Sequence, residues 1–172
     1  MSEDLPLNGD EHFPTERSTV VGAVDDARPD RWGERVIRLI DKPPRFSLLE
    51  YLFFAGDERF GALGVSTSPD TYMPQPCGPL PRLADVQEIR ELVRRVEANE
   101  PVPEAKRRLI APGTTLGGAR PKALIELDGR QWVVKFAELG DNTDTPLVEH
   151  ACLRLAAEAG IRVAQTRLIG LA

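Results

Sequence analysis

Apolar residues recur every three to four positions between residues 83 and 100, and this spacing predicts an amphipathic helix. The five that share one face are Val86, Ile89, Leu92, Val93 and Val96. An earlier helix with similar spacing is predicted to have Asp30 as its N-cap and to end before Pro43. We therefore expect a helix-rich first part of the chain, with the apolar faces of its helices turned toward one core.

A shorter helix is predicted to begin after Ser47, because Ser47 and Glu50 have the spacing of a capping box. Gly56 suits the left-handed position that follows the C-terminal end of such a helix. Residues 68–81 contain five prolines. Prolines at this density exclude a helix or a central strand and predict a loop.

Residues 122–136 have a different pattern, in which two runs of strand formers flank an Asp-Gly pair. This arrangement predicts an antiparallel hairpin with a two-residue turn. The turn sets the register, so Lys122 is expected to lie opposite Lys135. Because side chains alternate between the two faces, both lysines share one face, and Ile125 and Trp132 are expected to enter the core from the other.

A final helix is predicted with Thr145 as its N-cap, Pro146 as its first residue and Gly160 after its end. Its apolar stripe is expected to pack on the sheet and consists of Leu147, Val148, Ala151, Cys152, Leu155 and Ala159. Residues 161–172 read as a further strand. The predicted fold class is α+β, with a mostly helical subdomain over residues 1–110 that includes the proline-rich loop, and a second subdomain that begins at residue 111.

Composition narrows the range of partners. The formal net charge is −5, which argues against direct nucleic-acid binding. The two cysteines, Cys77 and Cys152, are far apart and indicate neither a disulfide framework nor a metal site. No apolar run approaches the ~18 residues that a membrane span needs. We therefore expect a cytoplasmic protein that binds no membrane and no metal through this chain.

The segment GTTLGGARPK, residues 113–122, combines three glycines with a terminal lysine. It has the glycine spacing of a Walker A loop, but Ala119 stands where that motif needs lysine and a strand follows, so a P-loop is excluded. Two lysines paired across a hairpin repel each other, and an anion cradled by the loop's N–H groups would relieve that repulsion. The alternative is that Lys122 is a solvated turn residue and that Lys135 reaches solvent from a strand edge.

Glu149 lies at the margin of the apolar stripe of the final helix, from where its carboxylate can reach Lys135. A lysine packed between helix and sheet without a partner would be unfavourable, so this pair is a reasonable expectation. The alternative is that Glu149 interacts only with the helix dipole. His150, Arg154 and Glu158 are expected to point away from the sheet.

Three segments carry a family resemblance: TLGGARPKA at 115–123, WVVKF at 132–136 and VEHACLRLAAEAGI at 148–161. They resemble HipA-type serine/threonine kinases, the toxins of bacterial HipBA toxin–antitoxin pairs. The family pattern S-x-x-G-A-x-x-K is followed with Thr115 in place of the serine. The segments ARPDRWGER at 27–35 and FGALG at 60–64 resemble the N-terminal region of that family.

The resemblance implies that residues 111–172 begin a kinase-like N-lobe, formed by the hairpin and one helix, that binds ATP with Mg²⁺. Lys135 would contact the ATP phosphates and pair with Glu149, and the other ATP-binding positions would be Gly117, Gly118, Ala119 and Lys122. Thr115 would be the phosphorylated residue, with Thr114 as the second choice. The resemblance also implies a HipB-like helix-turn-helix antitoxin as a partner.

A kinase needs a catalytic aspartate and Asn or Asp ligands for Mg²⁺. Only 172 − 136 = 36 residues follow Phe136, and their one acidic loop lacks the spacing of a catalytic loop. We therefore expect no catalytic residue and no Mg²⁺ ligand in this chain, which would be an N-terminal part of a kinase, inactive alone, with its C-lobe supplied in cis or in trans. Two alternatives remain: a non-catalytic module that binds an antitoxin or a separate C-lobe, and a plain α+β domain whose lysines are structural.

Overall fold

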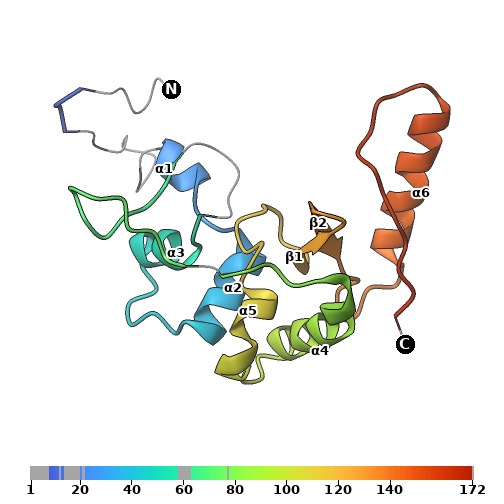
Figure 1. The fold of residues 1–172 in the computed structure, drawn as a ribbon, viewed down its shortest axis with the longest axis horizontal. Helices are drawn as coiled ribbons and strands as arrows, with labels where there is room; N and C mark the ends of the chain where they lie inside the picture. Colours follow the sequence, from blue (N-terminus) through green and yellow to red (C-terminus); the bar gives the residue numbers. More distant parts are fainter. Residues whose placement is uncertain are drawn as a thin grey trace.

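A computed structural model describes residues 8–11, 13, 20, 22–57, 63–76 and 78–171. Part of the FGALG segment, Cys77 and Ala172 lie outside the described residues. The elements follow in the order α1 Gly22–Asp26, α2 Arg31–Ile40, α3 Leu48–Phe54, η1 Leu83–Asp85, α4 Val86–Glu97, η2 Glu104–Lys106, α5 Arg107–Ile110, β1 Lys122–Leu127, β2 Arg130–Lys135 and α6 Thr145–Glu158. The fold class is α+β, as predicted (Figure 1).

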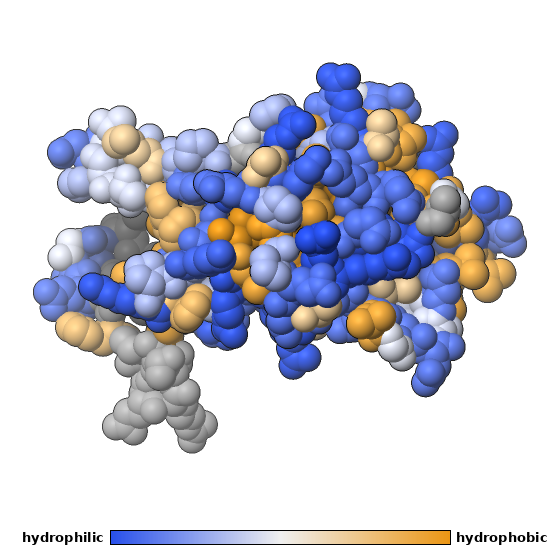
Figure 2. Space-filling view, turned by 90° about the horizontal axis from the view of Figure 1, so that it is seen from below, coloured by the Kyte–Doolittle hydropathy of each residue, from blue (hydrophilic) through white to orange (hydrophobic). Residues whose placement is uncertain are grey.

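The main core lies where α2, α4 and α5 pack against the hairpin. The five stripe residues of α4 are all buried there, which confirms the predicted helix face. Trp32 and Val36 enter the same cluster from α2, and Ala123 and Ile125 enter it from β1. Figure 1 shows α6 apart from this group. The face shown in Figure 2 is mainly hydrophilic, with apolar residues exposed between the hydrophilic ones.

The predicted capping box at the start of α3 is confirmed. Ser47 accepts a hydrogen bond from the Glu50 N–H, and the Glu50 carboxylate accepts one from the Ser47 N–H at 3.0 Å. Gly56 takes the left-handed conformation, with a φ of 67°. The described residues of the proline-rich segment 68–81 form neither helix nor strand. Local side-chain chemistry was therefore sufficient to predict these features.

The hairpin has the predicted register. Lys122 pairs with Lys135, Leu124 with Val133 and Ile125 with Trp132. Asp128 and Gly129, at the turn, have φ values of 54° and 68°, which is the left-handed pair that a type I′ turn requires. Burial is less even than predicted: Ile125 is fully buried, whereas Trp132 is only partly buried against the core.

Three predictions about the C-terminal part are wrong. The N-cap of α6 is Asp144, whose carboxylate accepts from the Leu147 N–H, so Thr145 is already the first helical residue. No residue of α6 is buried, and the predicted stripe is exposed, including Leu155 at 65%. Residues 161–171 form no strand, although Leu171 packs against the core.

The orientation of α6 follows from its few contacts. Glu149 pairs with Lys135 of β2, and this turns toward the sheet the helix side that carries Glu149, His150 and Leu153. The apolar stripe lies on another side and is left exposed. The prediction from the helical wheel required the more apolar side to face inward, but the contact that α6 makes with the sheet is the polar pair of Glu149 and Lys135.

Candidate phosphate-binding site

Lys135 and Glu149 form the ion pair that the sequence predicts. The Lys135 Nζ donates to Glu149 Oε1 at 2.5 Å, from the last residue of β2 to the first turns of α6. Their side chains are 47% and 43% exposed, so the pair is open to solvent rather than enclosed between helix and sheet. An ammonium group held in this way is available to an anionic ligand.

The glycine-rich loop has two halves with different surroundings. Gly113, Thr114 and Thr115 are buried, while residues 117–120 are exposed. Gly117 and Gly118 have φ values of 73° and 83°, which favour glycine at the exposed tip. The three glycines and few apolar residues of the loop predict little packing, which is wrong for its first half and applies only to its tip.

Lys122 differs from both interpretations offered by the sequence. It is 7% exposed, so it is not a solvated turn residue. Its Nζ donates to the Gly118 carbonyl at 2.8 Å and also to the Gly117 carbonyl, and so it points under the loop tip. Burial lowers the pKa of the Lys122 ammonium; the carboxylate of Asp30 raises it, and the charge of Lys135 lowers it further. The two lysines therefore share one electrostatic environment.

The candidate phosphorylation residues are both buried. Thr115 is 9% exposed and Thr114 is 4% exposed. The Thr114 carbonyl oxygen lies so close to Gly33 of α2 that a Cβ added to this glycine would come within 1.9 Å of it. The indole N–H of Trp32 donates to the Lys122 carbonyl at 2.9 Å. Helix α2 thus holds both ends of the loop, and either threonine must leave its buried position before it can be modified.

The structure brings in two charged residues that the sequence did not assign to the site. Asp30 accepts a hydrogen bond from the Gly118 N–H at the loop tip. On the other side of the tip, Arg120 donates to Asp141 with contacts of 2.5 and 3.3 Å. Asp30 was expected to cap α2, but its side chain makes no such bond. Neither pairing has a local sequence signal, because each joins residues that are far apart in the chain.

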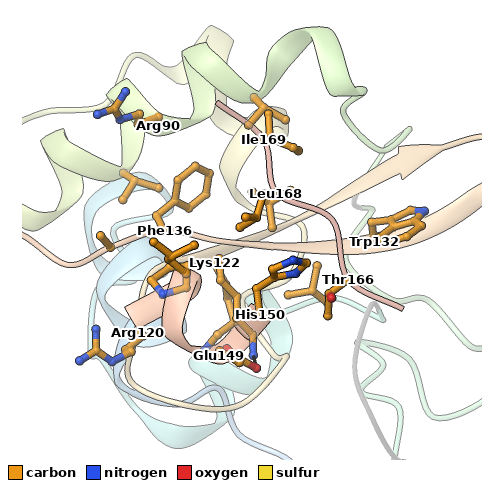
Figure 3. A pocket seen from close by; sticks show the side chains of 18 of the residues that line it. Arg90, Arg120, Lys122, Trp132, Phe136, Glu149, His150, Thr166, Leu168 and Ile169 are labelled. Atoms are coloured by element: carbon orange, nitrogen blue, oxygen red, sulfur yellow. Dashed lines mark hydrogen bonds and ion pairs between the residues drawn. The ribbon is translucent and has the colours of Figure 1, made fainter. Parts of the chain in front are cut away.

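A cavity of about 1340 Å³ adjoins these groups. It is lined by the hairpin, α4, the loop tip, α6 and residues 164–171. Figure 3 shows Lys122, Arg120 and Glu149 at one end, with Phe136, Leu168 and Ile169 farther along. His150 also lines the cavity, which corrects the expectation that it points away. Arg90 of α4 also lies at the end with Phe136 and Ile169, so the cavity combines charged and apolar side chains along its length.

Positively charged side chains and backbone N–H groups lie around the loop tip and Lys135. In the described part of the chain, no group of three or more His, Cys, Asp or Glu side chains is placed to hold a metal ion. Ammonium, guanidinium and backbone N–H groups are present instead, and these bind anions. None of the described helices is long and apolar enough to cross a membrane.

These features define a class of domain: an α+β unit in which a glycine loop leads into a hairpin and a lysine of the hairpin pairs with the following helix. Residues 114–172 match the family model of the HipA-like C-terminal domain. The match confirms the HipA resemblance for this segment, and the segment contains all the predicted site residues. No curated protein and no solved structure gives a significant match to the chain.

Proposed function

We propose that this chain carries the phosphate-binding part of a HipA-like serine/threonine kinase and that Lys135 binds the ATP phosphates. The observation that carries the proposal is the exposed Lys135–Glu149 pair beside the glycine loop. The family match over the same residues supports it. The adenine ring would use the apolar part of the adjoining cavity, and the phosphates would lie toward Lys135 and the loop tip.

The division of labour within the proposed kinase follows from the residues present. Lys135, Arg120 and the tip N–H groups neutralise and orient phosphates, which is a large part of phosphoryl-transfer catalysis. When bound with ATP, Mg²⁺ would supply further charge neutralisation, through ligands outside this chain. A catalytic aspartate is also expected outside it. We therefore propose that the chain binds ATP weakly and transfers no phosphate by itself.

The test is a calorimetric titration of the chain with ATP, comparing wild type with Lys135→Met. A matched control is Lys106→Met, because Lys106 forms a pair with Glu88 at the same 2.5 Å, with both side chains 44% exposed, away from the cavity. The expected result is that binding is lost in the Lys135 variant and retained in the Lys106 variant. Equal affinity in all three proteins would refute the ATP site.

A second candidate function is a non-catalytic module that binds a HipB-like antitoxin or a separate kinase C-lobe. The observation that favours it is the exposed apolar stripe of α6, in which Leu147, Val148 and Leu155 are 47%, 46% and 65% exposed. Apolar helix surface of this kind is typical of a protein contact. Leu155→Ser should weaken binding to a co-expressed partner without lowering stability, and a variant that keeps full partner binding would exclude this face.

A further inference from the structure

Asp30 lies at the N-cap position of α2, but its side chain does not cap the helix. An N-cap aspartate usually accepts a hydrogen bond from its own helix, and the Asp30 backbone has the extended conformation that allows this. The side chain instead reaches the glycine loop, 88 residues away in sequence, and accepts from the Gly118 N–H. The loop tip therefore already holds one anionic group, supplied by the residue that precedes α2.

The contact occupies a donor that a phosphate would use. A carboxylate oxygen and a phosphate oxygen both accept from backbone N–H groups, and both carry negative charge. Lys122 contacts the same residue, donating to the Gly118 carbonyl at 2.8 Å. The Gly118 N–H is thus bonded to the carboxylate of Asp30 and the Gly118 carbonyl to the ammonium of Lys122.

The segments on both sides of the loop tip are anchored to α2. Its first half is buried against Gly33, and the carbonyl of Lys122, just after the tip, accepts from the Trp32 indole. Both anchors belong to the same helix that follows Asp30. Asp30 is therefore placed close to both anchored ends of the loop, and the exposed tip that carries Gly118 lies between those ends.

We propose that Asp30 is an internal competitor for the anion bound by the glycine loop, and that its carboxylate must leave Gly118 before a phosphate takes that N–H. This regulation rests on the proposed ATP site. It implies that the N-terminal helical part sets the affinity of the loop: a movement of α2 that withdraws Asp30 would strengthen phosphate binding.

Two substitutions separate charge from hydrogen bonding. Asp30→Asn keeps an oxygen acceptor and a good N-cap residue but removes the charge, whereas Asp30→Ala removes both. Glu34→Gln is the matched control, since Glu34 lies one turn farther along α2 and makes no described contact with the loop. The full chain is titrated with ATP at low and high salt, and Lys135→Met is included.

We expect Asp30→Asn to bind ATP at least about threefold more tightly than wild type at low salt, as for removal of one exposed like charge. The difference should shrink at high salt, because screening weakens exposed charge interactions. Glu34→Gln should equal wild type. If binding depends on Lys135 but Asp30→Asn leaves the affinity unchanged, the competitor role is wrong and the ATP site stands. If no variant shows Lys135-dependent binding, both are wrong.

A second measurement does not depend on ATP. Asp30→Ala removes the acceptor of the Gly118 N–H, so the hydrogen-exchange rate of that amide, measured by NMR, should rise relative to wild type and to Glu34→Gln. An unchanged exchange rate at Gly118 would overturn the proposal whatever the titrations show.

Discussion

Replacement of Gly33 by alanine has two opposite effects on stability. It improves the helix propensity of α2, but it creates a clash with the Thr114 carbonyl of the glycine loop. Gly33 lies within α2, where alanine is favoured over glycine by about 1 kcal/mol. A Cβ at this position would lie 1.9 Å from the Thr114 carbonyl oxygen, whereas real Cβ contacts essentially never fall under 3.0 Å. Helix and loop would therefore have to separate by about 1.1 Å (3.0 − 1.9).

The obstacle is backbone in a buried segment, since Thr114 is 4% exposed, and a change of rotamer cannot relieve it. Overpacking costs about 1–3 kcal/mol, and backbone obstruction places this case near about 3 kcal/mol. After subtraction of the helix gain of about 1 kcal/mol, the free energy of unfolding should fall by about 2 kcal/mol.

Urea unfolding followed by circular dichroism measures this loss directly. Glu34→Ala, at the next position of the same helix, is the control and should change the free energy of unfolding by less than about 0.5 kcal/mol. A Gly33→Ala protein as stable as wild type, or more stable, would show that the loop does not rest on α2.

Three other predictions concern stability. Ile89→Ala, at a position that is 0% exposed, should lower the free energy of unfolding by about 2–5 kcal/mol in urea melts. A loss under about 1 kcal/mol would contradict the packing of α4 in the core. Trp132→Ala should cost less than about 3 kcal/mol, because the ring is only partly buried, and a loss of about 3 kcal/mol or more would contradict this. Burial raises the pKa of the Asp41 carboxyl, although Arg107 at 2.5 Å opposes the shift. The folded chain then binds the Asp41 proton more readily than the unfolded chain, so this group's contribution to stability should fall as pH rises through the raised pKa. The contribution should be absent in Asp41→Asn. The free energies of unfolding of wild type and Asp41→Asn are measured by urea melts over about pH 3–7, and the same pH dependence in both proteins would refute the prediction.

Several features could be predicted because they depend on neighbours in the chain. The stripe of α4 follows from spacing alone, and the Ser47–Glu50 box satisfies N–H groups three residues apart. The hairpin register follows from the geometry of a two-residue turn, which leaves one pairing available. The Lys135–Glu149 pair was expected from the position of Glu149 at the margin of the predicted stripe of α6, and the pair is present although that stripe is exposed.

Other features depended on contacts between distant segments. Asp30 at the loop tip and Arg120 beside Asp141 join residues whose separation in sequence gives no signal of their approach. The same holds for the backbone of Lys122, whose carbonyl accepts a hydrogen bond from the Trp32 indole of α2.

The orientation of α6 shows the physical limit most clearly. Its sequence is apolar on more than one side, so hydrophobicity alone does not choose the inward side. In the structure Glu149 contacts Lys135, while Leu155 on another side of the helix is exposed. The spacing of apolar residues and the geometry of turns determine local structure because they act over a few bonds. Which side of a helix packs inward is decided by the total free energy of contacts that exist only once the chain has folded.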